Sequence, residues 1–341
     1  MAQSSVLLSG FADESAHPRD QSQKAADRQF SVFAALGLQY YSIRFIDAGE
    51  GGKNAMKLSK QEIKTLRTMH AEYGLGVSSI GSPIGKVKLL DVEDGTKNAY
   101  IPFDKYLKND VRKACELALA FESKLIRGFS FYHPKGTDAG EHMAQSVDQL
   151  GRIAEMCDKE GLTFGLEVEP NLVGENGYLL AEIHKKVNHP ALVTVFDAAN
   201  IVVQGYSSAE ILDQLRAMLP GLGWLHIKDY ANPRPVKKGE HVNEDMLANF
   251  VPCDQGDAGH EALLREFGKA LPQIERRMKK RGAPGVFLDL EPHLKGGGQF
   301  GGFSGPDGMG VALRSLCRVL DYVKIGYHLR DFGDVKTARG F

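Results

Sequence analysis

Short apolar segments alternate with longer amphipathic segments along the chain, and this alternation constrains the fold more than any other feature. The eight predicted strands are 6–12, 40–45, 76–82, 125–132, 162–169, 192–198, 224–230 and 285–291. Between them, apolar residues recur every three to four positions, which is typical of helices with one buried face. These predicted helices are 23–37, 58–74, 108–122, 143–161, 207–219 and 260–282. Strands and helices that alternate in this way predict a parallel sheet in an α/β fold.

Two local signals refine the predicted helices. Ser59 stands before an amphipathic segment and Glu62 follows three residues later, which is the spacing of a capping box. Pro272 lies inside the segment 260–282, where a proline could interrupt the helix because it lacks the backbone N–H.

The number of strand–helix units points to a closed barrel. Eight strands with apolar residues on both faces predict a (β/α)8 TIM barrel, and 341 residues can form such a barrel as a single domain over residues 1–341. An open, doubly wound sheet is the alternative. Neither GxGxxG nor GxxxxGK[ST] follows any predicted strand, so the nucleotide-binding versions of that fold lack their phosphate cradle.

Three segments do not follow the alternation. Residues 83–107 come after the third predicted strand, residues 231–259 after the seventh, and the glycine-rich residues 295–308 after the eighth. Loops that follow the strands of a barrel lie on its catalytic face. We therefore expect extended loops there that act as lids or as partner surfaces.

Charge and cysteine content exclude several classes of protein. The 42 basic and 43 acidic residues give a formal net charge of −1, which disfavours a non-specific binder of nucleic acid or of an anionic membrane. No apolar run approaches 18 residues and residues 1–15 lack a basic signal-peptide start, so we expect neither a membrane span nor a leader. The scattered Cys115, Cys157, Cys253 and Cys317 predict free thiols in a reducing, cytoplasmic compartment.

Ionisable residues stand at the ends of four predicted strands, where an apolar strand has no packing reason to place them. Asp197 follows Glu167 by 30 positions and His226 follows Asp197 by 29, each about one barrel unit. Glu291 follows His226 by 65 positions, which is one unit plus the 231–259 insertion. Two glutamates, one aspartate and one histidine at a barrel mouth predict a divalent-metal site that suits Mn²⁺, Co²⁺, Mg²⁺ or Zn²⁺.

Four motifs, LEVEPN, FDAAN, LHIKD and LEPH, give the chain a specific resemblance. Together they resemble the sugar phosphate isomerase/epimerase superfamily of xylose isomerase-like barrels. That group includes ketose 3-epimerases, hydroxypyruvate isomerase, inosose dehydratases and endonuclease IV. The resemblance runs from GFADE near the first strand to GFSGP after the last.

The resemblance implies a metal set and an acid/base pair. It places Glu167, Asp197, His226 and Glu291 as ligands of one divalent cation, with Mn²⁺ the first expectation. Glu169 shares a strand face with Glu167 and is the alternative ligand, because Val168 stands where the family has asparagine. The resemblance further implies that Glu167 and Glu291 move a proton on opposite faces of a carbon beside a carbonyl, through an enediolate.

Other residues near strand ends are candidates for the surrounding site. His133 is a candidate acid/base, although an exposed loop histidine would look the same. Arg44 could bind a substrate oxygen or form a structural salt bridge. Asp257 lies in a segment that resembles the family's loop after the seventh strand. The predicted substrate-binding residues are Glu14, Arg44, Glu169, Lys228, Asp257 and His293.

We therefore expect a metal-dependent sugar isomerase or epimerase that acts on a small sugar. A first alternative is the catalytic subunit of a C-glycoside deglycosidase or 3-oxo-glycoside lyase, which resembles the same family and uses the same enolisation to expel an aglycone. A second is a non-catalytic carbohydrate-binding barrel. We expect a homo-oligomer, or a complex with a small β-rich subunit, and no nucleic-acid partner.

Overall fold

The computed structural model describes residues 5–16, 24–232, 238, 240–243, 247–296 and 302–340. Its main sheet contains a strand inside or overlapping every predicted strand segment. These strands are β1 (Leu7–Gly10), β2 (Tyr40–Ile43), β5 (Gly76–Gly81), β6 (Leu125–Gly128), β7 (Thr163–Glu167), β8 (Leu192–Asp197), β9 (Leu222–Ile227) and β12 (Phe287–Leu290). The prediction of strand–helix alternation is therefore confirmed.

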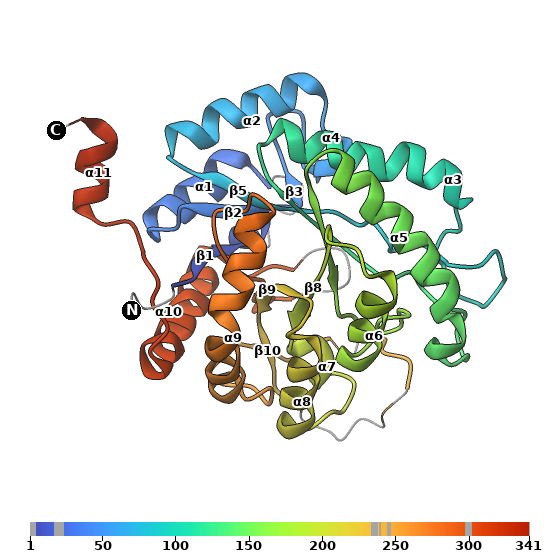
Figure 1. Cartoon of the computed structure of the whole chain (residues 1–341). Helices are drawn as coiled ribbons and strands as arrows, with labels where there is room; N and C mark the ends of the chain where they lie inside the picture. Colours follow the sequence, from blue (N-terminus) through green and yellow to red (C-terminus); the bar gives the residue numbers. More distant parts are fainter. Residues whose placement is uncertain are drawn as a thin grey trace.

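The eight strands curl into a nearly closed barrel (Figure 1). Their order is β1-β12-β9-β8-β7-β6-β5-β2, and every pairing for which the register is given is parallel. β1 and β2 are the two ends of this order, and an isolated parallel bridge between Phe11 and Ser42 joins their extensions. The predicted TIM barrel is confirmed, and the alternative of an open doubly wound sheet is wrong.

Helices surround the sheet (Figure 1). They are α1 (Ala26–Ala35), α2 (Lys60–Glu72), α3 (Phe103–Tyr106), α4 (Arg112–Ala120), α5 (Met143–Lys159), α6 (Gly177–Val187), α7 (Ala199–Val202), α8 (Ser208–Met218), α9 (His260–Lys280), α10 (Gly305–Val323) and α11 (Phe332–Arg339). α2 begins with the predicted capping box of Ser59 and Glu62. α9 continues through Pro272, so the interruption considered there does not occur.

α6 and α10 are helices that the sequence pattern did not predict. α10 begins with Gly305, Pro306 and two further glycines, and glycine lowers helix propensity by about 1 kcal/mol relative to alanine. Gly308 and Gly310 are nevertheless buried. Tertiary packing therefore overrides a weak local preference at this end of the chain.

The barrel interior is filled by a bulky side chain below its mouth. Trp224 of β9 is fully buried, and a Cβ atom at Gly165 of β7 would overlap the Trp224 indole. Residues two positions further along these strands, Glu167 and His226, share the inward face because side chains alternate along a strand. Trp224 thus fills the barrel beneath its mouth, and the polar residues lie above it at the carboxyl ends of the strands.

The loops at the mouth carry two short antiparallel strand pairs. β3 (Phe45–Ile46) pairs with β4 (Lys53–Asn54), and β10 (Asp229–Tyr230) pairs with β11 (Phe250–Val251). Parts of the predicted extended loops, residues 233–237, 239, 244–246 and 297–301, lie outside the described residues. Among the described helices, none combines the length and the apolar character that crossing a bilayer requires.

Candidate metal centre

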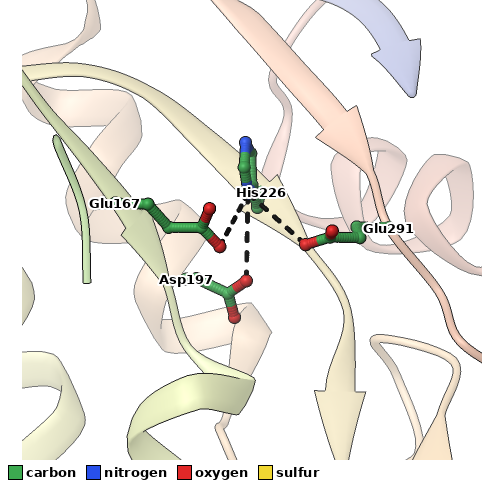
Figure 2. A group of neighbouring side chains, drawn as sticks. All are labelled: Glu167, Asp197, His226 and Glu291. Atoms are coloured by element: carbon green, nitrogen blue, oxygen red, sulfur yellow. Dashed lines mark ion pairs between the residues drawn. The ribbon is translucent and has the colours of Figure 1, made fainter. Parts of the chain in front are cut away.

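Four side chains meet at the carboxyl ends of β7, β8, β9 and β12, as Figure 2 shows. Nδ1 of His226 lies 3.1 Å from Oε1 of Glu167, 4.0 Å from Oδ2 of Asp197 and 3.5 Å from Oε2 of Glu291. One donor atom from each residue lies within 4.8 Å of the others. The strand ends thus bring one imidazole and three carboxylates around a single point.

Burial and charge together set the protonation of this cluster. Burial lowers the pKa of His226, but the carboxylates of Glu167 and Glu291 outweigh it and raise the pKa to about 10. Burial raises the pKa of Glu167, but His226 and Arg127 lower it to about 2. Burial raises the pKa of Asp197 to about 6 although Lys228 opposes this. Without a cation, the charged histidine offsets part of the negative charge of the acidic cluster.

Buried cations and an amide hold these carboxylates in place. Lys228 Nζ lies 2.9 Å from both Asp197 Oδ2 and Glu291 Oε2. Arg127 Nε lies 3.4 Å from Glu167 Oε2, and Asn200 Nδ2 donates to Glu167 Oε1 at 3.3 Å. Because outer groups fix the orientation of metal-binding side chains, this ring favours a preformed site.

The donor set fits a divalent cation. Hard carboxylate oxygens with one imidazole nitrogen suit Mn²⁺, Mg²⁺, Co²⁺ or Zn²⁺. Glu169, the alternative ligand, instead lies 2.7 Å from Lys86 Nζ and outside the four-residue cluster. The geometry therefore favours Glu167 as the glutamate of β7 that faces a metal.

A second acidic group lies beside the first. Glu14 is fully buried after β1, and its Oε1 lies 2.5 Å from Nδ1 of His293. Burial raises the pKa of Glu14, but His293 and Arg44 together lower it below its usual value. Arg44 Nη1 also lies 2.5 Å from Glu291 Oε1, so it joins this group to the four-residue cluster. Arg44 therefore forms buried salt bridges, which is one of the two roles expected from the sequence. Arg44 also lines the pocket above the cluster.

A pocket opens above the cluster. Its polar lining includes Arg127, Glu167, Asn200, Lys228 and Glu291. Its apolar lining includes Phe45, Phe129, Val242, Leu247 and Phe250. Arg44, Glu169 and His293 also face it. A molecule in this pocket could therefore contact both the charged cluster and apolar side chains.

Two predicted site residues are placed elsewhere. His133 is not among the described residues that line this pocket; its Nε2 lies 3.8 Å from Glu175 Oε2 and its ring stacks on His142. Asp257 is exposed and accepts a hydrogen bond from the backbone N–H of Asn232. His133 closely follows β6 in the sequence and Asp257 lies in the insertion after β9, and neither is among the described residues that line the pocket.

The sequence reasoning did not assign several residues that contact the site. Arg127 is a buried cation inside the apolar segment 125–132, a contrast that could have marked it. Asn200 closes the FDAAN motif, and its backbone N–H also donates to Asp197 Oδ1 at 3.1 Å. Lys86 comes from the loop after β5, where no local pattern identifies it.

The fold and the motifs agree with a known family. The sequence profile of the xylose isomerase-like TIM barrels matches residues 30–299. The chain belongs to the xylose isomerase-like TIM barrel family. No curated protein sequence matches the chain significantly.

Solved structures share this fold at low sequence identity. The IolI protein with a bound zinc atom has a TM-score of 0.64 and 14% identity, covering 93% of this chain and 99% of its own. A xylose isomerase-like protein from Mycobacterium smegmatis in complex with magnesium has a TM-score of 0.59 and 17% identity, covering 94% and 96%. D-psicose 3-epimerase from Clostridium cellulolyticum H10 with D-tagatose has a TM-score of 0.55 and 14% identity, covering 94% and 98%.

Proposed function

We propose that the protein is a divalent-metal-dependent sugar isomerase or epimerase that acts by proton abstraction beside a carbonyl. One observation carries this proposal: Glu167 and Glu291 approach His226 Nδ1 from different strands, at 3.1 Å and 3.5 Å, at the floor of the pocket. The proteins of similar fold that bind magnesium, zinc or D-tagatose support it.

The proposed roles follow from the geometry. Glu167, Asp197, His226 and Glu291 hold the ion. When bound, a divalent ion supplies Lewis-acid polarisation of a substrate carbonyl, which acidifies the neighbouring C–H. Glu167 or Glu291 then takes the carbon-bound proton, and the other carboxylate can return a proton to the opposite face. Arg127, Asn200 and Lys228 keep the carboxylates oriented.

The predictions of the metal, the substrate, the location and the assembly form part of this proposal. We propose Mn²⁺ as the ion and a small sugar as the substrate. Cytoplasmic location, assembly into a homo-oligomer and a β-rich partner subunit stay predictions, as does the single domain. His133 and Asp257 remain proposed site residues as well. For either to reach a substrate, the loop that carries it would have to move toward the pocket.

Deuterium exchange tests the proposed chemistry directly. The protein is loaded with Mn²⁺ and incubated in D₂O with D-fructose, D-tagatose, D-psicose and a 3-oxo-glucoside, and C–H exchange is followed by NMR. We expect exchange with at least one of these sugars. We expect Glu291→Gln to lower its rate by about 10²–10⁴-fold, because general acid–base catalysis contributes about that factor.

The matched control is Glu182→Gln, because Glu182 is half exposed on α6 in an ion pair with Lys186. It should leave exchange unchanged. Absence of exchange with every sugar, or absence of a stoichiometric divalent ion after reconstitution, contradicts the proposal. Sugar binding without exchange would instead favour the non-catalytic carbohydrate-binding barrel.

The apolar lining of the pocket supports a second candidate function. Phe45, Phe129 and Phe250, with Val242 and Leu247, add apolar side chains to the polar lining of the pocket. A free sugar has few apolar groups to place there, whereas an aryl aglycone buries such surface favourably. A C-glycoside deglycosidase or 3-oxo-glycoside lyase is therefore the alternative. Release of a phenol or flavonoid from a 3-oxo-glycoside, measured by chromatography, would favour it over the isomerase.

A further inference from the structure

Phe11, directly after β1, is fully buried, yet it is not part of the hydrophobic core of the barrel. Its backbone N–H donates to the carbonyl of Leu290 on β12 at 2.9 Å, and an isolated parallel bridge joins it to Ser42 of β2. The backbone of Phe11 is therefore held on both sides, where the barrel closes. Phe11 is not among the described residues that line the pocket, so any effect of its ring on a substrate passes through its neighbours.

The ring of Phe11 lies against two buried guanidinium groups. Cζ of Arg44 is 4.4 Å and Cζ of Arg127 is 5.2 Å from the ring centroid. A cation over an aromatic ring is attracted by the negative face of the ring, and the attraction is stronger where water is excluded. The imidazole of His226 meets the same ring edge-on, at 5.2 Å between centroids. The neighbours that set Phe11 apart from a core phenylalanine therefore all belong to the site.

Each of the two guanidinium groups reaches a different carboxylate of the proposed acid–base pair. Nη1 of Arg44 lies 2.5 Å from Oε1 of Glu291. Nε of Arg127 lies 3.4 Å from Oε2 of Glu167. One aromatic ring is thus the shared neighbour of the cations that hold both carboxylates.

The chain leaves space for this ring at one glycine of β5. A Cβ atom at residue 81 would lie 2.7 Å from Cε1 of Phe11 and 3.1 Å from Cβ of Arg44, so Gly81 admits both side chains. Any larger residue there would force one of them to shift. Complete burial, the two backbone contacts and Gly81 together leave the ring little freedom to move.

We propose that Phe11 is a positioning residue that fixes Arg44 and Arg127, and through them the spacing of Glu167 and Glu291. This inference rests on the proposed function, in which the two carboxylates move the carbon-bound proton. A base transfers a proton efficiently only when it is held within hydrogen-bond reach of that proton. Loosening the two arginines therefore slows proton transfer, whereas a merely structural phenylalanine would contribute to stability alone.

A series of fluorinated phenylalanines separates these two roles, because fluorine changes the charge distribution of the ring and nearly keeps its shape. Phe11 is replaced by monofluoro-, difluoro- and trifluorophenylalanine, and each fluorine makes the face of the ring less negative. With Mn²⁺ and the sugar that the wild-type protein exchanges, we expect C–H exchange in D₂O to slow with each added fluorine. Phe11→Leu should lower the rate by about 10–100-fold, the range typical of groups that orient metal-binding side chains.

The matched control is the same series at Phe33. This residue is also fully buried, but it lies on α1 in the hydrophobic core. Fluorination of Phe33 should leave C–H exchange unchanged. Phe33→Leu should lower the free energy of unfolding, measured with denaturant, without slowing exchange.

A second readout needs neither metal nor sugar. NMR of protein labelled with ¹⁵N-arginine follows the exchange of the Nε–H protons of Arg44 and Arg127 with water. A guanidinium group that is held less firmly opens to water more often, so we expect this exchange to become faster along the Phe11 series. It should stay constant along the Phe33 series.

The outcomes distinguish this inference from the proposed function. Absence of C–H exchange in the wild type overturns the proposed function, and this inference with it. Equal C–H exchange in the wild type and in the trifluorinated Phe11 protein overturns the inference alone. So does an equal slowing in the Phe33 series, or Nε–H exchange that fluorination of Phe11 leaves constant. If Phe11→Leu does not fold, the fluorinated proteins, which keep the ring, decide the question.

Discussion

His226 combines complete burial with three neighbouring carboxylates, and this makes it the residue most sensitive to a metal. Its side chain has 0% exposure. The nearby Glu167 and Glu291 raise its pKa to about 10 against the effect of burial. A metal ligand must be a neutral imidazole, so a cation and a proton compete for Nδ1. The proton-binding state of one side chain therefore reports whether the cluster holds a metal.

Calorimetry can detect this competition. Between about pH 7 and pH 9, Mn²⁺ binding should release about one proton per ion, because His226 is protonated before binding and neutral after it. The release should decline as pH rises through about 10, where the metal-free imidazole is already neutral. Titrations in buffers of different ionisation enthalpy measure the number released. Binding heats that are independent of the buffer at pH 8 would contradict the assignment of His226 as a ligand.

At the scale of elements, β7 and β9 position the site through the packing below it. Gly165 of β7 leaves room for the Trp224 indole of β9 inside the barrel. Glu167 and His226 lie two residues further along the same strands. Any change that separates the strands at the level of Trp224 therefore also separates the two site residues above it.

Two glycine substitutions test this dependence. Gly165→Ala should lower the free energy of unfolding by about 1–3 kcal/mol, because the added methyl group overpacks the barrel against Trp224. Gly151→Ala is the matched control: Gly151 lies within α5 with open space around its Cα, so alanine should raise stability by about 0.5–1 kcal/mol. Denaturant-induced unfolding measures both. Equal stability of the two variants would show that Trp224 yields to the new methyl group.

At the scale of the whole molecule, the site exists only when the barrel is formed. Its four side chains come from β7, β8, β9 and β12, which are separated in sequence by helices and loops. The unfolded chain does not hold these residues together, so the free energy of metal binding adds to that of folding. The proposed metal binding therefore predicts that metal content and stability are linked across the barrel.

Removal of the metal tests this linkage. At a free Mn²⁺ concentration of about 100 times the Kd, the free energy of unfolding should rise by about 2.7 kcal/mol, and EDTA should reverse the gain. Asp197→Asn should lose most of it, whereas Asp213→Asn should keep it because Asp213 is exposed on α8. Thermal unfolding with and without Mn²⁺ measures the effect. A gain that survives in Asp197→Asn would place the stabilising ion elsewhere.

The sequence by itself determined the barrel strands, the capped start of α2 and the grouping of Glu167, Asp197, His226 and Glu291. These features depend on local periodicity and on strand ends that parallel packing must bring to one face. Only the tertiary structure decided which neighbours of these residues face the pocket. It turned His133 toward Glu175, paired Glu169 with Lys86 and set His293 against Glu14. Loop paths and contacts between residues distant in sequence fix those directions, and no local pattern encodes either.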